Sequence, residues 1–371
     1  MSGVRALAAQ DISAVASLFQ RVFRKSTQAA PASLVDYIRH FYFDAPGIGD
    51  GIHSLVHVDD AGQVSGFIGV HALPMTCEGR QLRAAICGSL MVTDPEKDPL
   101  AGARLLKAFL DGPQDLSFSE SANDISNRLW TRLGGAVLTQ NSLDWIRVIQ
   151  PASFVLDVGA HRIPFASAFR AITRGVDTIW RKRLNPKKLN WSAVPVGGTG
   201  PKALETREIN SAQFAALLPA FTTDYVLKPD WETWWLDRVL ADAENKPELG
   251  PLVLATVTTR SGMEVGAFAY YAKAGAIGRV LQLLAKPGQA GPVIDCLIDH
   301  AAARGLSGLR GRLQPSFLDP MILRRIVFMP SGATVVHSRD AALLKAAIAG
   351  PAFLNGLAGE EWSRLIGGTF A

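Results

Sequence analysis

The chain has 371 residues, of which 48% are hydrophobic and 19% are charged, and its formal net charge is +5. This length exceeds what one hydrophobic core usually organises, so two domains are expected, and the composition excludes a disordered chain. The modest positive charge allows an anionic ligand without requiring a nucleic acid.

Three scattered cysteines, Cys77, Cys87 and Cys296, are too few for a disulfide framework or a zinc site. We expect buried, reduced thiols and therefore a reducing compartment. Residues 1–19 lack the apolar run of a signal peptide, and no stretch of about 18 apolar residues occurs anywhere. The expected location is the cytoplasm.

Residues 1–150 alternate between strand and helix patterns. In chain order, the predicted elements are strand 4–7, a helix from Asp11, helix 33–43, strands 54–58, 64–73 and 82–92, a helix around Leu105, strand 116–121, a helix from Asn123 and strand 136–149. The order is β-α-α-β-β-β-α-β-α-β, which indicates a mixed α/β (α+β) sheet covered by helices.

The helix that begins near Asn123 has the most informative pattern in the chain. Asn123 can cap it, and Gly134 with Gly135 forms a stop signal. Leu129 and Trp130 lie on its apolar face. The pattern therefore predicts a strand, a capped helix and a second strand in succession.

This stretch resembles the helix that closes the acyl-CoA site in the GNAT acyltransferase superfamily, which reads roughly Asn-x-x-Ala-x-x-Leu-Tyr-x-Lys-Leu-Gly-Phe. The residues that fall in register with it are Asn123, Ser126, Leu129, Trp130, Leu133 and Gly134. The order of elements over residues 1–150 is also that of the GNAT fold. The resemblance implies an acyl-CoA-binding domain over these residues.

The resemblance also implies a pyrophosphate loop before the leucine pair Leu105-Leu106. Aligning that pair places Lys97 at the family's basic position, Leu100 at its first glycine and Gly102 at its second. A plain amphipathic helix after a proline-containing loop would show the same pattern. The residues that the resemblance assigns to acyl-CoA binding are Met91, Val92, Lys97, Ala101, Gly102, Ala103, Arg104, Asn123, Asn127 and Trp130.

Trp130 occupies the position at which many family members place a tyrosine that protonates the leaving thiolate. An indole N–H cannot take that role, so a packing or cofactor-flanking role is favoured. Glu120 and Ser121 end the preceding strand, and we expect them in the catalytic site, with Glu120 as the base that accepts a proton from an amine. An exposed strand-end carboxylate without a catalytic role is the alternative for Glu120.

The segment 201–371 repeats the same order of elements more loosely. Its predicted elements are strand 204–209, a helix at Ser211, a Trp-rich helix after Pro229, strands 252–258, 265–272 and 276–285, helix 293–304 and strand 308–313. We expect a second, degenerate GNAT-like domain that builds the acceptor pocket or the interface. His53, His57 and His71 lack companion ligands at metal-binding spacing, so no metal site is expected.

Residues 151–200 do not fit the fold and are expected to form a basic helical connector. Between residues 162 and 188, the basic side chains face one acid, Asp177, and the apolar residues Ile172, Val176, Ile179 and Trp180 recur at helical spacing. Two interpretations remain. The apolar stripe either packs between the domains or contacts an anionic membrane surface.

The function favoured by these patterns is transfer of an acyl group, with acetyl as the default, from CoA to a small-molecule amine by direct attack. A lipid-linked amine or an amino sugar is expected if residues 162–188 contact a membrane. One alternative is a tandem GNAT-fold transferase that uses aminoacyl-tRNA, in which case tRNA would be a partner. The other is a non-catalytic binding protein of the same fold.

Overall fold

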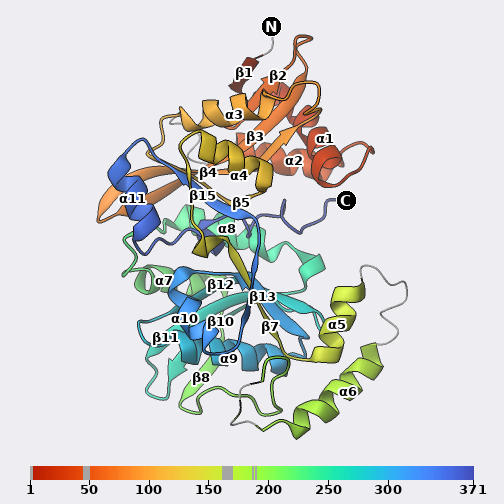
Figure 1. The fold of residues 1–371 in the computed structure, drawn as a ribbon, viewed down its shortest axis with the longest axis vertical. Coiled ribbons are helices and arrows are strands. Elements are labelled where there is room, and N and C mark those ends of the chain that lie inside the picture. Colours follow the sequence, from red (N-terminus) through yellow and green to blue (C-terminus); the bar gives the residue numbers. More distant parts are fainter. Residues whose placement is uncertain (1–2, 45–50, 161–169, 186–187, 189) are drawn as a thin grey trace.

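The computed structural model describes residues 3–44, 51–160, 170–185, 188 and 190–371. These residues form two mixed sheets that lie one above the other (Figure 1). The first sheet contains, in spatial order, β1 (Gly3–Ala6), β2 (Leu55–Val58), β3 (Val64–Cys77), β4 (Arg80–Val92), β5 (Leu116–Ala122), β15 (Ala333–His337) and β6 (Ala136–Val137), and β9 (Leu227–Pro229) pairs with β3.

The second sheet repeats this arrangement. Its strands are, in spatial order, β14 (Val327–Pro330), β7 (Leu143–Val148), β13 (Gly308–Arg312), β12 (Ile277–Ala285), β11 (Glu264–Tyr271), β10 (Leu252–Thr259) and β8 (Leu204–Glu208). In each sheet a parallel pair, β4 with β5 or β12 with β13, lies among antiparallel neighbours. The predicted mixed α/β fold with two tandem GNAT-like units is confirmed.

The two sheets exchange one strand each. Strand β7 lies within residues 1–150 but pairs with β13 and β14 of the second sheet. Strand β15 lies within residues 201–371 but pairs with β5 and β6 of the first sheet. The single strand predicted over residues 136–149 is wrong for the same reason, because a 3₁₀ turn at Gln140–Ser142 separates β6 from β7 where the chain passes between the sheets.

Helices cover both faces of each sheet. The helices of the first unit are α1 (Ile12–Phe23), α2 (Ala32–Ile38), α3 (Ala101–Leu110), α4 (Asp124–Arg132) and α11 (Ala341–Ala349), which contacts β15. Those of the second are α7 (Ser211–Phe221), α8 (Thr233–Glu244), α9 (Ala290–Ala303) and α10 (Leu318–Ile322). One core cluster contains buried residues of α1, α2, α7 and α8 together, while α3 with α4 and α9 with α10 belong to separate outer clusters. The two units therefore share their central core.

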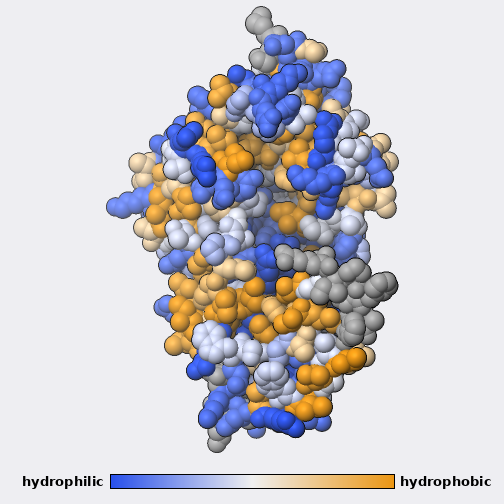
Figure 2. Space-filling model, turned by 45° about the vertical axis from the view of Figure 1, so that its right-hand side comes forward, coloured by the Kyte–Doolittle hydropathy of each residue, from blue (hydrophilic) through white to orange (hydrophobic). Residues whose placement is uncertain are grey.

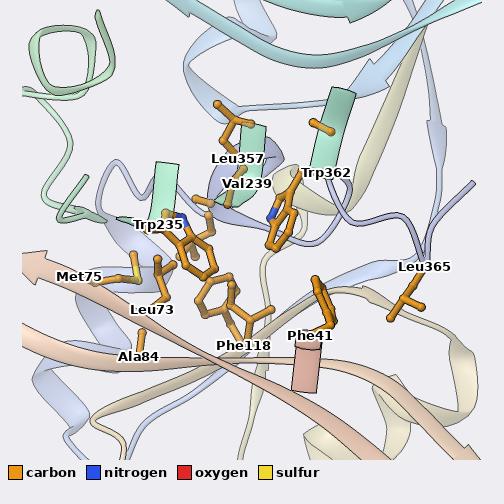
Figure 3. Packing of buried hydrophobic residues seen from close by; sticks show 14 of the residues in the cluster. Phe41, Leu73, Met75, Ala84, Phe118, Trp235, Val239, Leu357, Trp362 and Leu365 are labelled. Atoms are coloured by element: carbon orange, nitrogen blue, oxygen red, sulfur yellow. The ribbon is translucent and has the colours of Figure 1, made fainter. Parts of the chain in front are cut away.

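Residues 350–371, which we call the C-terminal segment, enter this shared core. Trp362 is fully buried and lies edge-on to Trp235 of α8, with ring centroids 5.5 Å apart. Phe41, from the π-helical turn at Arg39–Phe43, contacts the other side of Trp362, also at 5.5 Å between centroids. Figure 3 shows these rings with Phe118 of β5, so the segment joins both units.

The predicted connector contains two helices, α5 (Pro151–Ala160) and α6 (Arg170–Arg183), which contact each other and extend at one side of the second unit (Figure 1). Residues 161–169, 186, 187 and 189 of this region lie outside the described residues. Within the described part of the chain, no helix is long and apolar enough to cross a membrane.

Candidate active site

The parallel strands β4 and β5 separate at the centre of the first sheet. They pair from Ala84 with Leu116 to Ile86 with Phe118, and then diverge. Beyond that point, β5 continues to pair with β15, while β4 makes a bulge at Ser89, whose φ is 55°. We call the gap between residues 87–92 and 119–122 the first wedge. Such a gap leaves backbone groups of both strands available to a ligand.

The carboxylate of Glu360, from the C-terminal segment, lies in the first wedge. Its Oε1 accepts hydrogen bonds from the Ser119 hydroxyl and the Glu120 amide, each at 2.9 Å. Its Oε2 accepts a hydrogen bond from the Ser121 hydroxyl, also at 2.9 Å. Burial raises the pKa of the Glu360 carboxyl, and the hydrogen bond from the Glu120 amide opposes that shift. A carboxylate with a raised pKa is a stronger base than an exposed one.

Glu120 is fully buried, which corrects the alternative of an exposed carboxylate at the strand end. Its side chain points to the side of β5 opposite Ser121, where it accepts hydrogen bonds from the amides of Gly356 at 3.2 Å and Glu360 at 2.8 Å. Burial, followed by the charge of Glu361, raises the pKa of Glu120 to about 7. Glu120 thus fixes the turn that carries Glu360, rather than facing a substrate directly.

A cavity of about 280 Å³ opens beside the first wedge. Its polar side contains Ser89, Ser121 and Glu360. Its remaining wall is mainly apolar and comes from α1, the π-helical turn, β3 and the C-terminal segment; it includes Phe19, Phe23, Phe41, Tyr42, His71, Leu365 and Ile366. Arg24, which follows α1 and donates a hydrogen bond to the Gly368 carbonyl, also lines it. The cavity therefore offers one carboxylate and one guanidinium in an otherwise mainly aromatic and aliphatic pocket. Of the two predicted catalytic residues, Ser121 lines it and Glu120 lies behind it.

His71 and Tyr42 stack in the wall of this cavity, with ring centroids 5.0 Å apart. Burial, with a further contribution from Arg238, holds the pKa of His71 well below its usual value, so its imidazole is neutral. Its buried Nδ1 has no hydrogen-bond partner among the described residues. The Tyr42 hydroxyl donates a hydrogen bond to Ser89 Oγ at 3.1 Å, which connects the π-helical turn to the bulge of β4.

The predicted cofactor residues lie around the end of β4, the start of α3 and α4. A Cβ built on Gly102 would lie 3.6 Å from Val92 and 3.8 Å from Leu129, so this glycine faces the space between the three elements. Lys97 is exposed nearby, and Ala101 and the side chain of Met91 are buried. Asn123 caps α4, with its Oδ1 accepting a hydrogen bond from the Ser126 amide at 2.9 Å.

The loop before α3 differs from a phosphate-binding loop in one respect. Asp94 accepts hydrogen bonds from the amides of Glu96 and Lys97, at 3.2 and 3.1 Å, and Asp98 accepts one from Leu100 at 3.2 Å. Asp98 also pairs with Arg104 at 2.8 Å. The side chains of Asp94 and Asp98 therefore already bind loop amides and Arg104, which in a phosphate-binding loop would be available to bind the anion. The amides of Gly102 and Ala103, in the first turn of α3, lie beyond these caps.

Trp130 is fully buried and packs against Phe109, with ring centroids 6.1 Å apart. It belongs to the core under α3 and α4, so its expected contact with a cofactor is corrected to a packing role. Asn127, on the same helix, has a buried Oδ1 that is without a hydrogen-bond partner in the described part of the chain. A donor group on a ligand would satisfy this oxygen.

The second unit has the corresponding wedge between β12 and β13, but the C-terminal segment closes it. Gln282 accepts a hydrogen bond from the Leu357 amide at 3.0 Å, and the remaining space has a volume of about 10 Å³. The C-terminal segment therefore fills the second wedge with residues 355–357 and places Glu360 in the first. This leaves the larger cavity in the first unit.

Sequence reasoning missed Glu360. Glu360 and Glu361 are two adjacent acidic residues within the mainly apolar sequence that follows α11. This pair was the sequence feature from which a buried acidic site could have been predicted. Glu361 pairs with Arg279 at 3.1 Å, and although burial acts to raise its pKa, Arg279 and Arg312 hold that pKa below its usual value. In the described part of the chain, no group of three or more His, Cys, Asp or Glu side chains is placed to bind a metal ion.

No protein-family model and no curated protein matches this chain. Solved structures do match it. A GCN5-related N-acetyltransferase from Kribbella flavida aligns with a TM-score of 0.55 at 13% identity, covering 94% of this chain and 73% of that one. A conserved protein of unknown function and probable N-acyltransferase from Enterococcus faecalis V583 aligns with a TM-score of 0.58 at 12% identity, covering 91% and 73%.

A GCN5-related N-acetyltransferase from Anabaena variabilis ATCC 29413 aligns with a TM-score of 0.57 at 10% identity, again covering 91% of this chain and 73% of that one. At such identities the likeness shows the fold. The chain has the GNAT acyltransferase fold, as the resemblance of the segment from Asn123 to Gly135 predicts.

Proposed function

We propose that the chain transfers an acyl group from an acyl-CoA thioester to a primary amine at the first wedge. The observation that carries the proposal is the position of Glu360, a buried carboxylate between the diverging strands, beside the bulge of β4 and at the end of a cavity. Buried carboxylates with raised pKa values in a concave site are typical of general bases.

In the proposed reaction, the amine nitrogen attacks the thioester carbonyl, a C–N bond forms and the C–S bond breaks. Glu360 Oε2 accepts the amine proton. The thiolate of CoA leaves, and an ordinary thiol pKa of about 8.5 makes it a sufficient leaving group without an assigned acid. The exposed backbone at the bulge near Ser89 polarises the carbonyl.

The residues present fit an acyl-CoA donor at several points. The free edge of β4 would hold its amide-containing arm, the first-turn amides of Gly102 and Ala103 with Lys97 would hold the pyrophosphate, and Asn127 Oδ1 would accept a hydrogen bond. CoA supplies the thioester that makes the acyl group reactive. We propose acetyl as the default acyl group.

The cavity chemistry favours a small primary amine with an apolar face as the acceptor. Glu360 would accept a hydrogen bond from the amino group, and the rings of Phe19, Phe41 and Tyr42 would pack against the carbon skeleton. A lipid-linked amine and an amino sugar each present a primary amino group attached to a carbon skeleton, as this cavity requires.

The capped amides before α3 favour a second candidate. Because Asp94 and Asp98 already occupy part of the loop, the donor could be an aminoacyl-tRNA, which does not need the CoA pyrophosphate site. In this case the same wedge and the same base would act on an aminoacyl ester.

The test is release of free CoA thiol from acetyl-CoA in the presence of phenethylamine, hexylamine or glucosamine. We expect amine-dependent release, and we expect Glu360→Gln to lower kcat by about 100-fold or more, which is the usual contribution of a general base. Glu264→Gln, a change at an exposed position at the start of β11, is the matched control and should leave kcat unchanged.

Other outcomes would separate the alternatives. Saturable acetyl-CoA binding without transfer to any amine would indicate a binding protein. Binding of aminoacyl-tRNA by a chain that binds no CoA thioester would support the second candidate and overturn the first.

A further inference from the structure

The orientation of α6 around its own axis is fixed by one buried acid. Asp177 accepts hydrogen bonds from the amides of Ala152 and Ser153, each at 2.9 Å, and from the Ser153 hydroxyl at 2.6 Å. These amides form the start of α5, where a carboxylate is favoured by the unpaired N–H groups and the helix dipole. The face of α6 that carries Asp177 is therefore the inner face, held against α5.

A second face of α6, beside the one that carries Asp177, is apolar and lies in solvent. Ile172, Val176, Ile179 and Trp180, at spacings of four, three and one residues, form one stripe with exposed fractions of 63, 48, 58 and 48%. Val155 and Val158 of α5 are exposed by 71 and 56%. We call these six residues the hairpin face. In a helix that packs on its own protein, this stripe would be buried, so the expectation that it packs between the domains is wrong.

Basic side chains accompany the hairpin face. Arg174, Lys182, Arg183 and Lys188 are exposed. The two acids of the helices are both engaged: Asp177 caps α5, and Asp157 accepts a hydrogen bond from the Ile277 amide at 3.0 Å and lies 3.9 Å from Arg170. Figure 2 shows a hydrophobic band at the lower right, where α6 lies, ending beside hydrophilic residues.

We propose that the hairpin face docks on an anionic lipid bilayer, with α6 lying in the interface. An exposed apolar stripe marks a docking surface, and the accompanying positive charge selects the negatively charged lipid surface as its occupant. Trp180 on the stripe is of the residue type that is enriched at the level of lipid headgroups. This inference does not depend on the proposed reaction.

The test is co-sedimentation of the full chain with vesicles of phosphatidylcholine alone or mixed with phosphatidylglycerol. We expect binding to the mixed vesicles at low salt, and at least about tenfold weaker binding to neutral vesicles or at high salt. The double change Lys182→Glu with Arg183→Glu should weaken binding by a similar factor. Arg181 is left unchanged because its Nε donates a hydrogen bond to the Val194 carbonyl at 2.7 Å and holds the helix in place.

A second variant tests the contribution of the apolar side chains to vesicle binding. The double change Ile179→Ser with Trp180→Ser should reduce vesicle binding at least about tenfold, since it removes much of the apolar stripe without touching the inner face. The matched controls are Lys202→Glu with Lys345→Glu for charge and Met263→Ser with Ile348→Ser for exposed apolar residues elsewhere, and all four positions are exposed. Both controls should bind as the unchanged chain does.

Several results would overturn the proposal. Absence of binding to mixed vesicles at low salt would do so, as would binding that survives the serine pair. Self-association in solution that the same serine pair abolishes would show that the face contacts a second copy. Binding of tRNA and not of vesicles would also overturn it. If that tRNA binding were lost when Lys182 and Arg183 are changed to Glu, the face would be a nucleic-acid-binding surface.

Discussion

The side-chain carboxylates of Glu120 and Glu360 each accept a hydrogen bond from the backbone amide of the other residue. The Glu120 amide donates a hydrogen bond to Glu360 Oε1 at 2.9 Å, and the Glu360 amide donates one to Glu120 Oε2 at 2.8 Å. The two residues are separated by 240 positions in the chain. This reciprocal pair fixes the C-terminal segment against β5 and sets the direction of the Glu360 carboxylate in the first wedge.

The first prediction is a pH dependence of stability that Glu120 causes. Its pKa in the folded chain is raised to about 7, above an unfolded value of about 4.3, so the unfolded chain releases this proton first. The stabilising contribution is fully present below the unfolded pKa and is lost as the pH rises through about 7. We expect the free energy of unfolding, measured by urea titration, to fall across this window by about 3–4 kcal/mol more than in Glu120→Gln. Parallel curves for the two proteins would contradict the assignment.

The second prediction concerns the turn that Glu120 holds. A Cβ at Gly359 would lie 1.9 Å from Glu120 Oε2, so Gly359→Ala must displace either the carboxylate or the turn. We expect lower thermal stability and a lower rate of acyl transfer, because Glu360 lies one residue further on. Gly175→Ala is the control, since a Cβ there meets nothing within 4 Å. Equal activity in the two variants would show that the turn does not position Glu360.

The third prediction tests the cofactor site at α3. Gly102→Glu would place a carboxylate between Val92 and Leu129, beside the proposed pyrophosphate position. Charge repulsion should then abolish acetyl-CoA binding in calorimetric titration, while far-UV circular dichroism stays that of the unchanged chain. Gly102→Ala is the matched control, because its Cβ makes only ordinary contacts. A folded glutamate variant with unchanged affinity would place the donor elsewhere.

The fourth prediction concerns Trp130. Because its ring is fully buried against Phe109, Trp130→Phe should leave substantial transferase activity and act mainly on stability. We expect a loss of about 1–3 kcal/mol in the free energy of unfolding, the usual range for a change of shape in a core. A variant that retains stability and cofactor affinity but loses turnover would require a chemical role for the indole.

The fifth prediction concerns Trp362, which joins the C-terminal segment to both units. Trp362→Ala should remove contacts with Trp235 and Phe41 and cost about 3–5 kcal/mol of stability. Denaturant unfolding measures the loss. Trp191→Ala, at a position 57% exposed, should cost far less in the same assay. A similar cost in both would indicate that the segment does not stabilise the shared core.

The sequence by itself determined most of the local elements up to residue 132 and several of those over residues 204–313, while β14, β15 and α11 were not predicted. The apolar periodicity and the cap at Asn123 predict α4, because both depend on residues a few positions apart. The same local reasoning identified the amphipathic stripe of α6 and the second copy of the fold in residues 201–371.

Only the tertiary structure decided where β7, β15 and the apolar stripe of α6 lie. Strands β7 and β15 each have two equivalent gaps available, beside β5 or beside β13, and their own patterns do not distinguish between them. The stripe of α6 is apolar whether it is buried or exposed, and the packing of α6 against α5 through Asp177 leaves it in solvent. Glu360 becomes a site residue only because the C-terminal segment returns to β5. Such contacts depend on which surfaces meet in the folded chain, and local sequence patterns carry no record of that choice.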